Sequence, residues 1–594
     1  MVTESVFGNQ CPHLFSGFKH ILTFNHGDDV DSFFAKAEQF LSRGCWLCGY
    51  FSYEFGYFLE GALAHLRESS SFPLAWLGVC REAQPIAPAS LNGRGQRRFA
   101  VKNIKANISE QEYCSQIKKI KYFLEEGQTY QVNFTFKNEF DFQGNVFDFY
   151  ASLRRAQFTA LGAVINTGEE VILSFSPELF FRMERGRILS RPMKGTVARG
   201  RTFGQDQANR RWLSRSLKIK AENVMIVDLV RNDLGRVSSG VRVPKLFEIE
   251  KYRTLYQMTS TVQARLKKDT KIKDIFLSLF PCGSVTGAPK IRTMQIIKSL
   301  EAQSRGVYTG AIGYISPNRD ACFNVAIRTV CLRGGKAELG IGGGIVYDSV
   351  EENEFNEAIL KSKFLVEEFP VFFLIESILW EKGQGYFLRD LHLRRLQNSC
   401  EYFGVPLDSR ELDRKLQKLE KVLNRALAEK WKVRILVSMD AKISIEHKVL
   451  GQQSAVVKVA VSSKRINADN KFLYHKTTNR CIYDEELSKA RREGFFEVMF
   501  LNNRGELTEG AISNIFVEKK GTLYTPALKS GLLPGVLREH LLANKEVQET
   551  TLYPQDIYEA DRVYIGNSVR GLIRAVVSPL KKRVICPIEK VLYI

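Results

Sequence analysis

The segment FSPELFFRMERGRILSRPMKGTVARG, residues 175–200, holds the first side chains that could do chemistry. It reads as strands around a turn, with Lys194 between an apolar residue and a Gly-Thr pair. Apolar surroundings disfavour the charged form of a lysine, so its pKa falls and a neutral amine becomes available as a nucleophile. A lysine near a turn is more often simply solvated, and this pattern alone leaves both interpretations open.

Acidic side chains recur on two segments with helical spacing. Glu222 begins the helical run ENVMIVDLVRND, and EENEFNEAILKSK places Glu354, Glu357 and Lys361 at spacings of three and four, hence on one helical face. Carboxylates brought together from two helices would suit Mg²⁺, a hard cation that takes oxygen ligands and keeps several waters. The same spacing also describes two solvated faces with ion pairs inside each helix.

The C-terminal half carries a second set of reactive residues. Lys476 lies in FLYHKTTNR, Glu509 follows in LTEG, and the turn GLLPGVLREHLL comes further on. A lysine Schiff base with pyridoxal phosphate (PLP) needs an acid at the pyridine nitrogen, donors for the phosphate and a base over the reacting carbon. Each of these parts is present, although any one of them alone would be an ordinary surface residue.

The elements that must position these residues mix strands and amphipathic helices. VILSFS, GAIGYIS and FNVAIRTV read as strands, whereas residues 108–127, 207–234 and 288–303 have helical periodicity. A glycine-rich strand, GIGGGIVYDS, would let backbone N–H groups approach an anion closely. This mixture predicts an α+β fold with substantial antiparallel sheet.

A domain boundary is predicted between the two halves. In KFLVEEFPVFF a charged helix end meets Pro370, which cannot continue a helix, and a β-rich segment follows. We therefore place the boundary near residue 368, with domains at 1–368 and 369–594.

Composition limits the classes of protein to consider. The 594 residues are 44% hydrophobic, which excludes a disordered, collagenous or disulfide-stapled chain. The net charge of +21 is spread along the sequence without a stripe of cations and aromatics, so it favours an anionic small substrate over nucleic acid. A basic scaffold or nucleic-acid-binding chain is the alternative that is not an enzyme.

Cysteine usage and the N-terminus bear on the compartment. The 11 cysteines are an odd number, scattered over the whole length, and the one close pair, Cys45 and Cys48, has no second pair to complete a zinc site. No basic segment followed by an apolar one opens the chain, and no apolar run is long enough to span a bilayer. The sequence therefore predicts a cytoplasmic protein in a reducing compartment, with no membrane partner.

Between about 170 and 365 the chain resembles the chorismate-utilising enzymes, and within them the aminodeoxychorismate synthases. The resemblance rests on SPE, RPMKGT, ENVMIVDLVRND, GSVTGAPK, YTGAIGY, AIRT and GGGIVYDS, in that order. It implies one large α+β domain with two packed antiparallel sheets. The turn of related anthranilate synthases carries Ala where this chain has Lys194, whereas the aminodeoxychorismate synthases carry Lys.

The resemblance implies a role for each matching residue. Lys194 would attack C2 of chorismate while Glu178 acts as the general acid for the departing C4 hydroxyl, and ammonia would then enter at C4. Gln257 is a departure, because many relatives carry His there and a neutral amide cannot replace its acid-base function. The matching motifs also imply Mg²⁺ ligands at Glu222, Glu354 and Glu357, and chorismate contacts at Gly195, Thr196, Tyr308, Arg328, Gly342, Gly343, Gly344 and Lys361.

Residues 371 to 580 resemble the class IV aminotransferases of fold type IV, with 4-amino-4-deoxychorismate lyases among them. The resemblance implies that Lys476 forms the Schiff base with PLP and that Glu509 pairs with the pyridine nitrogen. It also implies a homodimer through this domain. The remaining implied cofactor contacts are Arg395, Asn514, Gly535, Val536 and Leu537, with Arg395 and the turn amides on the phosphate.

Together the two resemblances imply a bifunctional enzyme that converts chorismate to 4-aminobenzoate for folate synthesis. We find no Cys in a Gly-x-Cys-x-Gly nucleophile turn, so ammonia is expected from a separate glutamine amidotransferase subunit. The alternative enzyme is an anthranilate synthase component I joined to a class IV amino acid aminotransferase.

Overall fold

The computed structural model describes residues 1–3, 12–87, 91, 98–157, 161–366 and 369–578. The chain divides into two compact units: Met1–Arg199 with Asn209–Phe369, and Gly200–Ala208 with Pro370–Ile594. The predicted boundary at residue 368 lies outside the described residues. No helix in the described part of the chain is long and apolar enough to cross a membrane.

The first unit is built on two ten-stranded sheets whose pairings are all antiparallel in the described residues. One sheet has the order β16 (Gly287–Ala288), β8 (Gln131–Gly144), β20 (Lys336–Ile345), β19 (Thr329–Arg333), β10 (Val171–Ser176), β9 (Leu161–Asn166), β1 (Val2–Thr3), β2 (His13–Leu14) and β6 (Gln84–Pro85), with β7 (Phe99–Ala106) beside β8. The other has the order β13 (Met193–Ala198), β15 (Leu255–Leu266), β12 (Arg187–Arg191), β11 (Leu179–Glu184), β18 (Ala321–Val325), β17 (Ala311–Ile315), β4 (Trp46–Phe51), β5 (Ala75–Cys80) and β3 (His20–Phe24), with β14 (Ser238–Lys251) beside β15.

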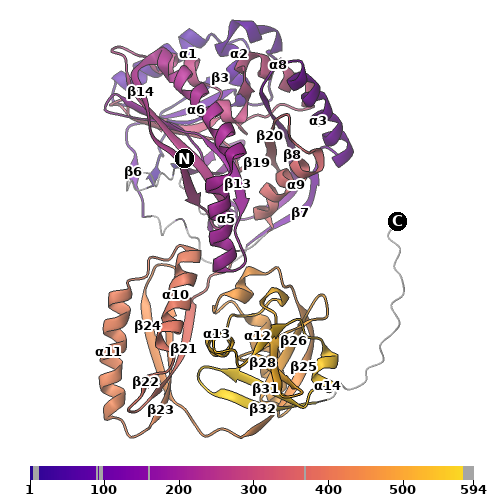
Figure 1. The fold of residues 1–594 in the computed structure, drawn as a ribbon. Coiled ribbons are helices and arrows are strands. Elements are labelled where there is room, and N and C mark those ends of the chain that lie inside the picture. The colour runs from indigo at the N-terminus through magenta and orange to yellow at the C-terminus, as the bar shows by residue number, and fades with distance from the viewer. Residues whose placement is uncertain (4–11, 88–90, 92–97, 158–160, 367–368, 579–594) are drawn as a thin grey trace. The chain divides into compact units, whose positions relative to one another are not determined.

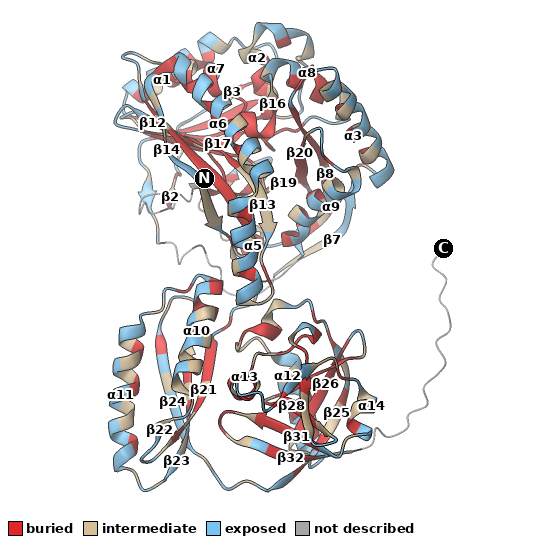
Figure 2. Cartoon of the chain, in the orientation of Figure 1, coloured by how far each residue is buried: buried red, intermediate tan, exposed pale blue. Residues whose placement is uncertain are grey.

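The two sheets pack against each other, and helices cover their outer faces (Figure 2). Ile165 and Ile172 of the first sheet share a buried apolar cluster with Trp76 and Ile312 of the second. The helices are α1 (Val30–Ser42), α2 (Gly56–Leu59), α3 (Glu110–Glu125), α4 (Val146–Gln157), α6 (Leu217–Val237), α7 (Ile272–Leu279), α8 (Lys290–Leu300) and α9 (Glu351–Ser362), with the part of α5 (Phe203–Arg215) that follows Ala208. The predicted α+β class with two packed antiparallel sheets is confirmed.

Two helix starts show how local sequence sets these elements. Ser109 and Glu112 form a reciprocal capping box that begins α3. The continuous helix predicted over 207–234 is instead two helices, because Ser216 adopts an extended conformation and its hydroxyl accepts a hydrogen bond from the Ile219 N–H at 3.4 Å. This break gives α6, which carries Glu222, a direction of its own.

The second unit contains a four-stranded and an eight-stranded sheet (Figure 1). The smaller has the order β22 (Gly385–Tyr386), β21 (Leu374–Glu381), β23 (Lys430–Val437) and β24 (Ile443–Val449), all antiparallel. The larger is mixed, in the order β27 (Leu507–Gly510), β26 (Glu497–Asn502), β25 (Val456–Ile466), β32 (Gly571–Val577), β31 (Arg562–Asn567), β28 (Asn514–Lys519), β29 (Thr522–Pro526) and β30 (Gln548–Thr550). The helices are α10 (Arg389–Phe403), α11 (Ser409–Arg425), α12 (Cys481–Arg492), α13 (Val536–Ala543) and α14 (Pro554–Tyr558).

Candidate functional sites

Lys194 lies on β13 with its amine against the glycine strand β20. A Cβ atom added to Gly344 would lie 2.4 Å from Lys194 Nζ, so only a glycine leaves room for the amine at this point. Gly195 has a φ of +89°, and a side chain there would meet Ile219. Gly344 is therefore required by the position of the lysine amine, and Gly195 by its backbone conformation and its contact with Ile219.

The surroundings of Lys194 favour its neutral form. Burial lowers the pKa of its amine, and Lys361 lowers this pKa further, whereas Glu222, Glu178 and Glu357 act in the opposite sense. These four predicted residues therefore lie within electrostatic range of Lys194, although they come from different parts of the chain. A buried amine with a lowered pKa is the form that can act as a nucleophile.

Glu178 is a buried carboxyl group just before β11. The Ser284 hydroxyl donates to Glu178 Oε1 at 2.6 Å, and the backbone is fixed by the bond from Val325 N–H to the Glu178 carbonyl. Burial raises the pKa of Glu178 to about 7, against smaller opposing effects of Ser284 and Lys194. A carboxyl group that is protonated near neutrality can serve as a general acid.

Arg328 is a cation that pairs with no carboxylate among the described residues. Its Nη1 donates to Gln157 Oε1 at 2.6 Å, and its guanidinium lies 5.9 Å from the centre of the Tyr252 ring. Burial lowers the pKa of Arg328 to about 10. Because a guanidinium has five N–H donors, the other donors of Arg328 are available to grip an anionic group.

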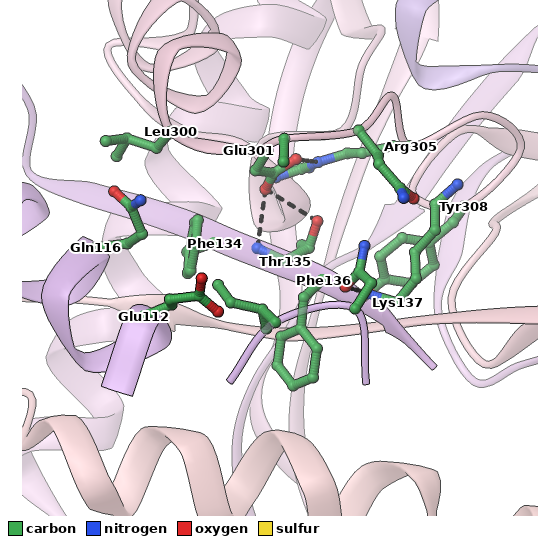
Figure 3. A pocket seen from close by; sticks show the side chains of 14 residues that line it. Glu112, Gln116, Phe134, Thr135, Phe136, Lys137, Leu300, Glu301, Arg305 and Tyr308 are labelled. Atoms are coloured by element: carbon green, nitrogen blue, oxygen red, sulfur yellow. Dashed lines mark hydrogen bonds and ion pairs between the residues drawn. The ribbon is translucent and has the colours of Figure 1, made fainter. Parts of the chain in front are cut away.

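Tyr308 and Thr196 are held by the two sheets. A Cβ atom on Gly340 would lie 2.2 Å from the Tyr308 ring, so the ring packs flat on β20. Tyr308 also lines a cavity of about 160 Å³, where Glu301 accepts from the Thr135 N–H and pairs with Arg305 (Figure 3). Thr196 pairs across the strands with Gln257, the position that departs from the family pattern.

The acidic face of α9 lies beside the glycine strand. Lys361 Nζ pairs with Glu357 at 2.9 Å and donates to the Gly342 carbonyl at 2.9 Å. A Cβ atom on Gly343 would lie 3.5 Å from Glu354 Oε2, an ordinary contact. Burial raises the pKa of Glu354, whereas Lys361 lowers that of Glu357.

The predicted metal ligands do not form a closed metal site. Among the described residues no three His, Cys, Asp or Glu side chains are gathered closely enough to hold an ion by themselves. Glu222 on α6 and Glu357 on α9 both act to raise the pKa of Lys194, and Glu357 acts to raise the pKa of Glu354. These carboxylates therefore lie around Lys194, but by themselves they do not make a complete set of metal ligands.

Sequence reasoning missed three side chains of this site. Gln131 at the start of β8 is fully buried, and neither its amide oxygen nor its nitrogen has a hydrogen-bond partner. Each such unpaired atom costs about 1–3 kcal/mol. Gln157 and Ser284 are the partners of Arg328 and Glu178, and the motif GSVTGAPK that contains Ser284 was the signal for it; the two glutamines carried no signal.

In the second unit, Lys476 lies beside β21. The Ile375 N–H donates to the Lys476 carbonyl at 2.9 Å, and Leu374 forms a β-bridge with Thr477. Burial lowers the pKa of Lys476 to about 7, with Arg395 acting in the same sense and Glu376 opposing. The amine is therefore partly neutral at physiological pH, as Schiff-base formation requires.

Arg395 is oriented by a buried carboxylate that sequence reasoning did not identify. Its Nε and Nη2 donate to the two oxygens of Glu376 at 2.8 Å, and Nη1 donates to the Pro534 carbonyl at 2.9 Å. His392 Nδ1 lies 2.7 Å from Glu376 Oε2, and its Nε2 is buried without a partner. Burial acts to raise the pKa of Glu376, but Arg395 and His392 outweigh it and hold that pKa well below its usual range.

Glu509 on β27 is buried between two donors. The Tyr483 hydroxyl donates to its Oε1 at 3.0 Å and the Leu533 N–H to its Oε2 at 3.1 Å. Burial raises the pKa of Glu509 to about 7, and these two donors only partly oppose the effect. Lys476 is also within electrostatic range, so the predicted acid and the predicted lysine belong to one site.

The turn before α13 closes this site. Gly535 caps the helix that Val536 and Leu537 begin, and a Cβ atom on Gly535 would lie 1.8 Å from Asn514 Oδ1. Asn514 Nδ2 donates in turn to the Leu533 carbonyl at 3.2 Å. The glycine and the asparagine therefore hold the backbone amides at the helix start in a fixed position.

Comparison with known proteins finds two family models that match different parts of the chain. Residues 8–367 match the chorismate binding enzyme family, and residues 374–577 match the class IV amino-transferases. Aminodeoxychorismate synthase component 1 of Klebsiella aerogenes is 40% identical over 259 residues, which are 43% of this chain and 57% of that protein. Anthranilate synthase component 1 of Acetivibrio thermocellus is 38% identical over 268 residues, 44% of this chain and 54% of the relative.

A solved structure supports the fold of the first unit. The crystal structure of anthranilate synthase component I from Streptococcus pneumoniae has a TM-score of 0.54 and 25% identity, and the match covers 61% of this chain and 93% of that one. The chain spans only slightly more than half the length of the two curated relatives. The two relatives have similar sequence identity to this chain, so identity alone does not distinguish an aminodeoxychorismate synthase from an anthranilate synthase. Individual residues must distinguish them.

Proposed function

Because the chain belongs to the chorismate binding enzyme family, we propose that residues 1–368 aminate chorismate to 4-amino-4-deoxychorismate. We propose further that residues 369–594 are a PLP-dependent lyase domain that removes pyruvate from this product to give 4-aminobenzoate for folate synthesis. The observation that carries the first proposal is the buried amine of Lys194, with its lowered pKa, beside a Glu178 whose pKa is about 7.

The first reaction follows from these two groups. Lys194 Nζ forms a bond to C2 of the ring, the ring π electrons shift, and the C4–oxygen bond breaks as Glu178 donates a proton to the leaving hydroxide. Ammonia then attacks C4, the π electrons shift back, and the C2–nitrogen bond breaks to restore the lysine. A relative with alanine at this turn has no such nucleophile, which is why Lys194 favours the aminodeoxychorismate activity over the anthranilate alternative.

Cationic and backbone donors account for binding of a dicarboxylated ring. Arg328 pairs with no carboxylate in the part of the chain that the structure describes, and burial already disfavours its charge. A bound substrate carboxylate would offset the unfavourable effect of burial on the charge of Arg328. Tyr308, Thr196, Gly195 and the strand Gly342–Gly344 would complete the substrate contacts. Lys361 of α9 contacts the same strand by donating to the Gly342 carbonyl.

In this proposal a magnesium ion would be held by carboxylates of α6 and α9. Mg²⁺ needs only one or two protein carboxylates when waters and substrate oxygens fill the other positions. Glu222 and Glu357, with Glu354 beside them, are the residues that would hold it. The ion would neutralise a substrate carboxylate and orient the ring.

The second site fits PLP. Arg395 makes three hydrogen bonds with Glu376 and Pro534, so two of its five N–H groups remain for a phosphate. The buried His392 Nε2 has no protein partner, and the amides of Gly535, Val536 and Leu537 begin a helix. PLP, when bound, supplies an electron sink that stabilises negative charge at the carbon losing its proton.

The residues of the second site would then move protons. Lys476, with a pKa of about 7, would bind the cofactor, and once released would take the proton from C4 of the ring. Glu509 would hold the pyridine nitrogen in its protonated form, while Asn514 fixes the neighbouring turn. Loss of pyruvate leaves an aromatic ring, which makes this step strongly favourable.

Two partners belong to the proposal. A separate glutamine amidotransferase subunit would supply ammonia, since relatives carry the name of a first component. A second copy of the chain would pair through the PLP domain, as the class IV resemblance implies.

The test is a product assay with purified protein, chorismate, ammonium, Mg²⁺ and PLP. The expected product is 4-aminobenzoate, and accumulation of anthranilate would instead support the alternative enzyme. Absorbance of bound PLP that shifts on borohydride reduction and is absent in Lys476→Ala tests the second domain separately.

A further inference from the structure

Gln131 has no function in the mechanism above, although it lies beside the nucleophile. A Cβ atom on Gly344 would lie 2.4 Å from Lys194 Nζ and 3.1 Å from Gln131 Nε2, so the two nitrogens are no further apart than these two distances combined. Gln131 is fully buried, and both polar atoms of its amide lack partners. A primary amide in such a position needs a donor and an acceptor at the same time.

The backbone holds this glutamine rigidly. Its carbonyl accepts from the Thr129 hydroxyl at 3.0 Å, and a Cβ atom on Gly287 would lie 1.9 Å from that carbonyl oxygen. Gln131 is the first residue of β8, and it pairs with Ala288 on the neighbouring strand β16. The Gln131 side chain therefore extends toward Lys194 from a fixed position in the sheet. A loosely held backbone does not explain why its amide is unpaired.

We propose that Gln131 is the positioning residue for Lys194. Its amide oxygen accepts an N–H of the neutral amine, which turns the lone pair of Nζ toward the ring, and its amide nitrogen donates to the substrate carboxylate beside C2. The proposal deepens the proposed function, on which it rests, because it names the group that ties the nucleophile to the carbon it attacks. The amide nitrogen gains its partner when the substrate is bound.

The charged groups around the Lys194 amine determine how a substitution of Gln131 should change the pKa of that amine. Glu178, Glu222 and Glu357 face Lys194 from three elements, and Lys361 is the cation that faces it. Glu354 on α9 also lies within electrostatic range. Gln131 is neutral and adds no charge to this balance, so replacing it by a carboxylate would favour the ammonium form of Lys194.

The experiment compares Gln131→Met and Gln131→Glu in the full chain, with Gln116→Met as the matched control. Gln116 also has a buried, unpaired amide oxygen, but it lies on α3 and lines the cavity of Figure 3. We expect Gln131→Met to lower kcat for aminodeoxychorismate formation at least tenfold, with KM for chorismate changed less than threefold and an unchanged or higher Tm. The control should keep the kcat of the unmodified protein.

Gln131→Glu supplies the second readout. The acid limb of its pH–rate profile should move to higher pH by about one to three units, because a nearby carboxylate raises the pKa of Lys194. Labelling of Lys194 with an amine-reactive reagent, followed by mass spectrometry across pH, should show the same shift without any product assay. A Gln131→Met kcat within twofold of the unmodified protein, or an unshifted Lys194 pKa in Gln131→Glu, overturns the proposal.

These readouts separate the two levels of inference. If the unmodified protein forms no aminodeoxychorismate while the labelling pKa shifts as expected, the proposed function fails and the contact between Gln131 and Lys194 stands. If the product forms and the Gln131 variants behave like the control, only the role of Gln131 fails.

Discussion

Substitution of Gly344 by alanine should disable the first reaction by moving the nucleophile. The new Cβ atom would lie 2.4 Å from Lys194 Nζ, whereas ordinary van der Waals contacts begin near 3.4 Å. The amine must therefore retreat by about 1 Å, and a displacement of this size costs roughly 100-fold in rate, or about 2.7 kcal/mol of transition-state stabilisation. The atom displaced is the end of a flexible side chain, so the fold should tolerate the change.

The assay for this prediction measures the initial rate of aminodeoxychorismate formation from chorismate and ammonium. Conversion of supplied aminodeoxychorismate to 4-aminobenzoate serves as an internal reference for the second domain. Gly235→Ala is the matched control, because this glycine lies on α6 with no atom within 4 Å of an added Cβ. A Gly344→Ala protein that keeps more than half of the control's rate would refute the placement of the amine.

Four further predictions use the same two assays. Lys194→Ala should abolish formation of 4-aminobenzoate from chorismate and leave conversion of supplied aminodeoxychorismate intact; loss of both activities would show that the two domains are not independent. Glu509→Ala should spare the first reaction and impair the second, and an unaffected lyase rate would remove Glu509 from its role. The synthase rate should fall as pH rises through about 7, where Glu178 loses the proton that it must donate, and Ser284→Ala should move this alkaline limb to higher pH because the Ser284 hydroxyl lowers the pKa of Glu178. An alkaline limb at the same pH in both proteins would exclude Glu178 as the acid. Removal of divalent cations by a chelator should stop the synthase reaction and leave the lyase reaction unchanged, with recovery on adding Mg²⁺; full synthase activity in the chelator would argue against a metal.

Burial explains why the two reactive lysines differ from other lysines of this basic chain. Lys194 and Lys476 have lowered pKa values mainly because burial removes water from the ammonium form. Lys336, by contrast, is exposed and paired with Asp141, which raises its pKa. The same side-chain type is therefore a nucleophile or a surface cation depending on what surrounds it.

The sequence by itself determined the residues that motifs carry. Lys194, Glu178, Lys476 and Glu509 each lie in a short run whose order along the chain indicates a family, and α3 (Glu110–Glu125) lies within the helix predicted over 108–127. Such features depend on residues close together in the sequence, so they can be read without the fold. Their roles in the reactions stay predictions until the variants are measured.

Only the tertiary structure decided what surrounds those residues. Gln131 and Lys194 both lie against Gly344 of β20, which pairs with β8, and Glu376 meets Arg395 because α10 packs on β21. Neutral amides and buried acids have no characteristic spacing, and their partners come from segments far apart in the chain. Desolvation, which sets the pKa of each reactive group, is a property of the packed interior and is present only once distant elements exclude water together.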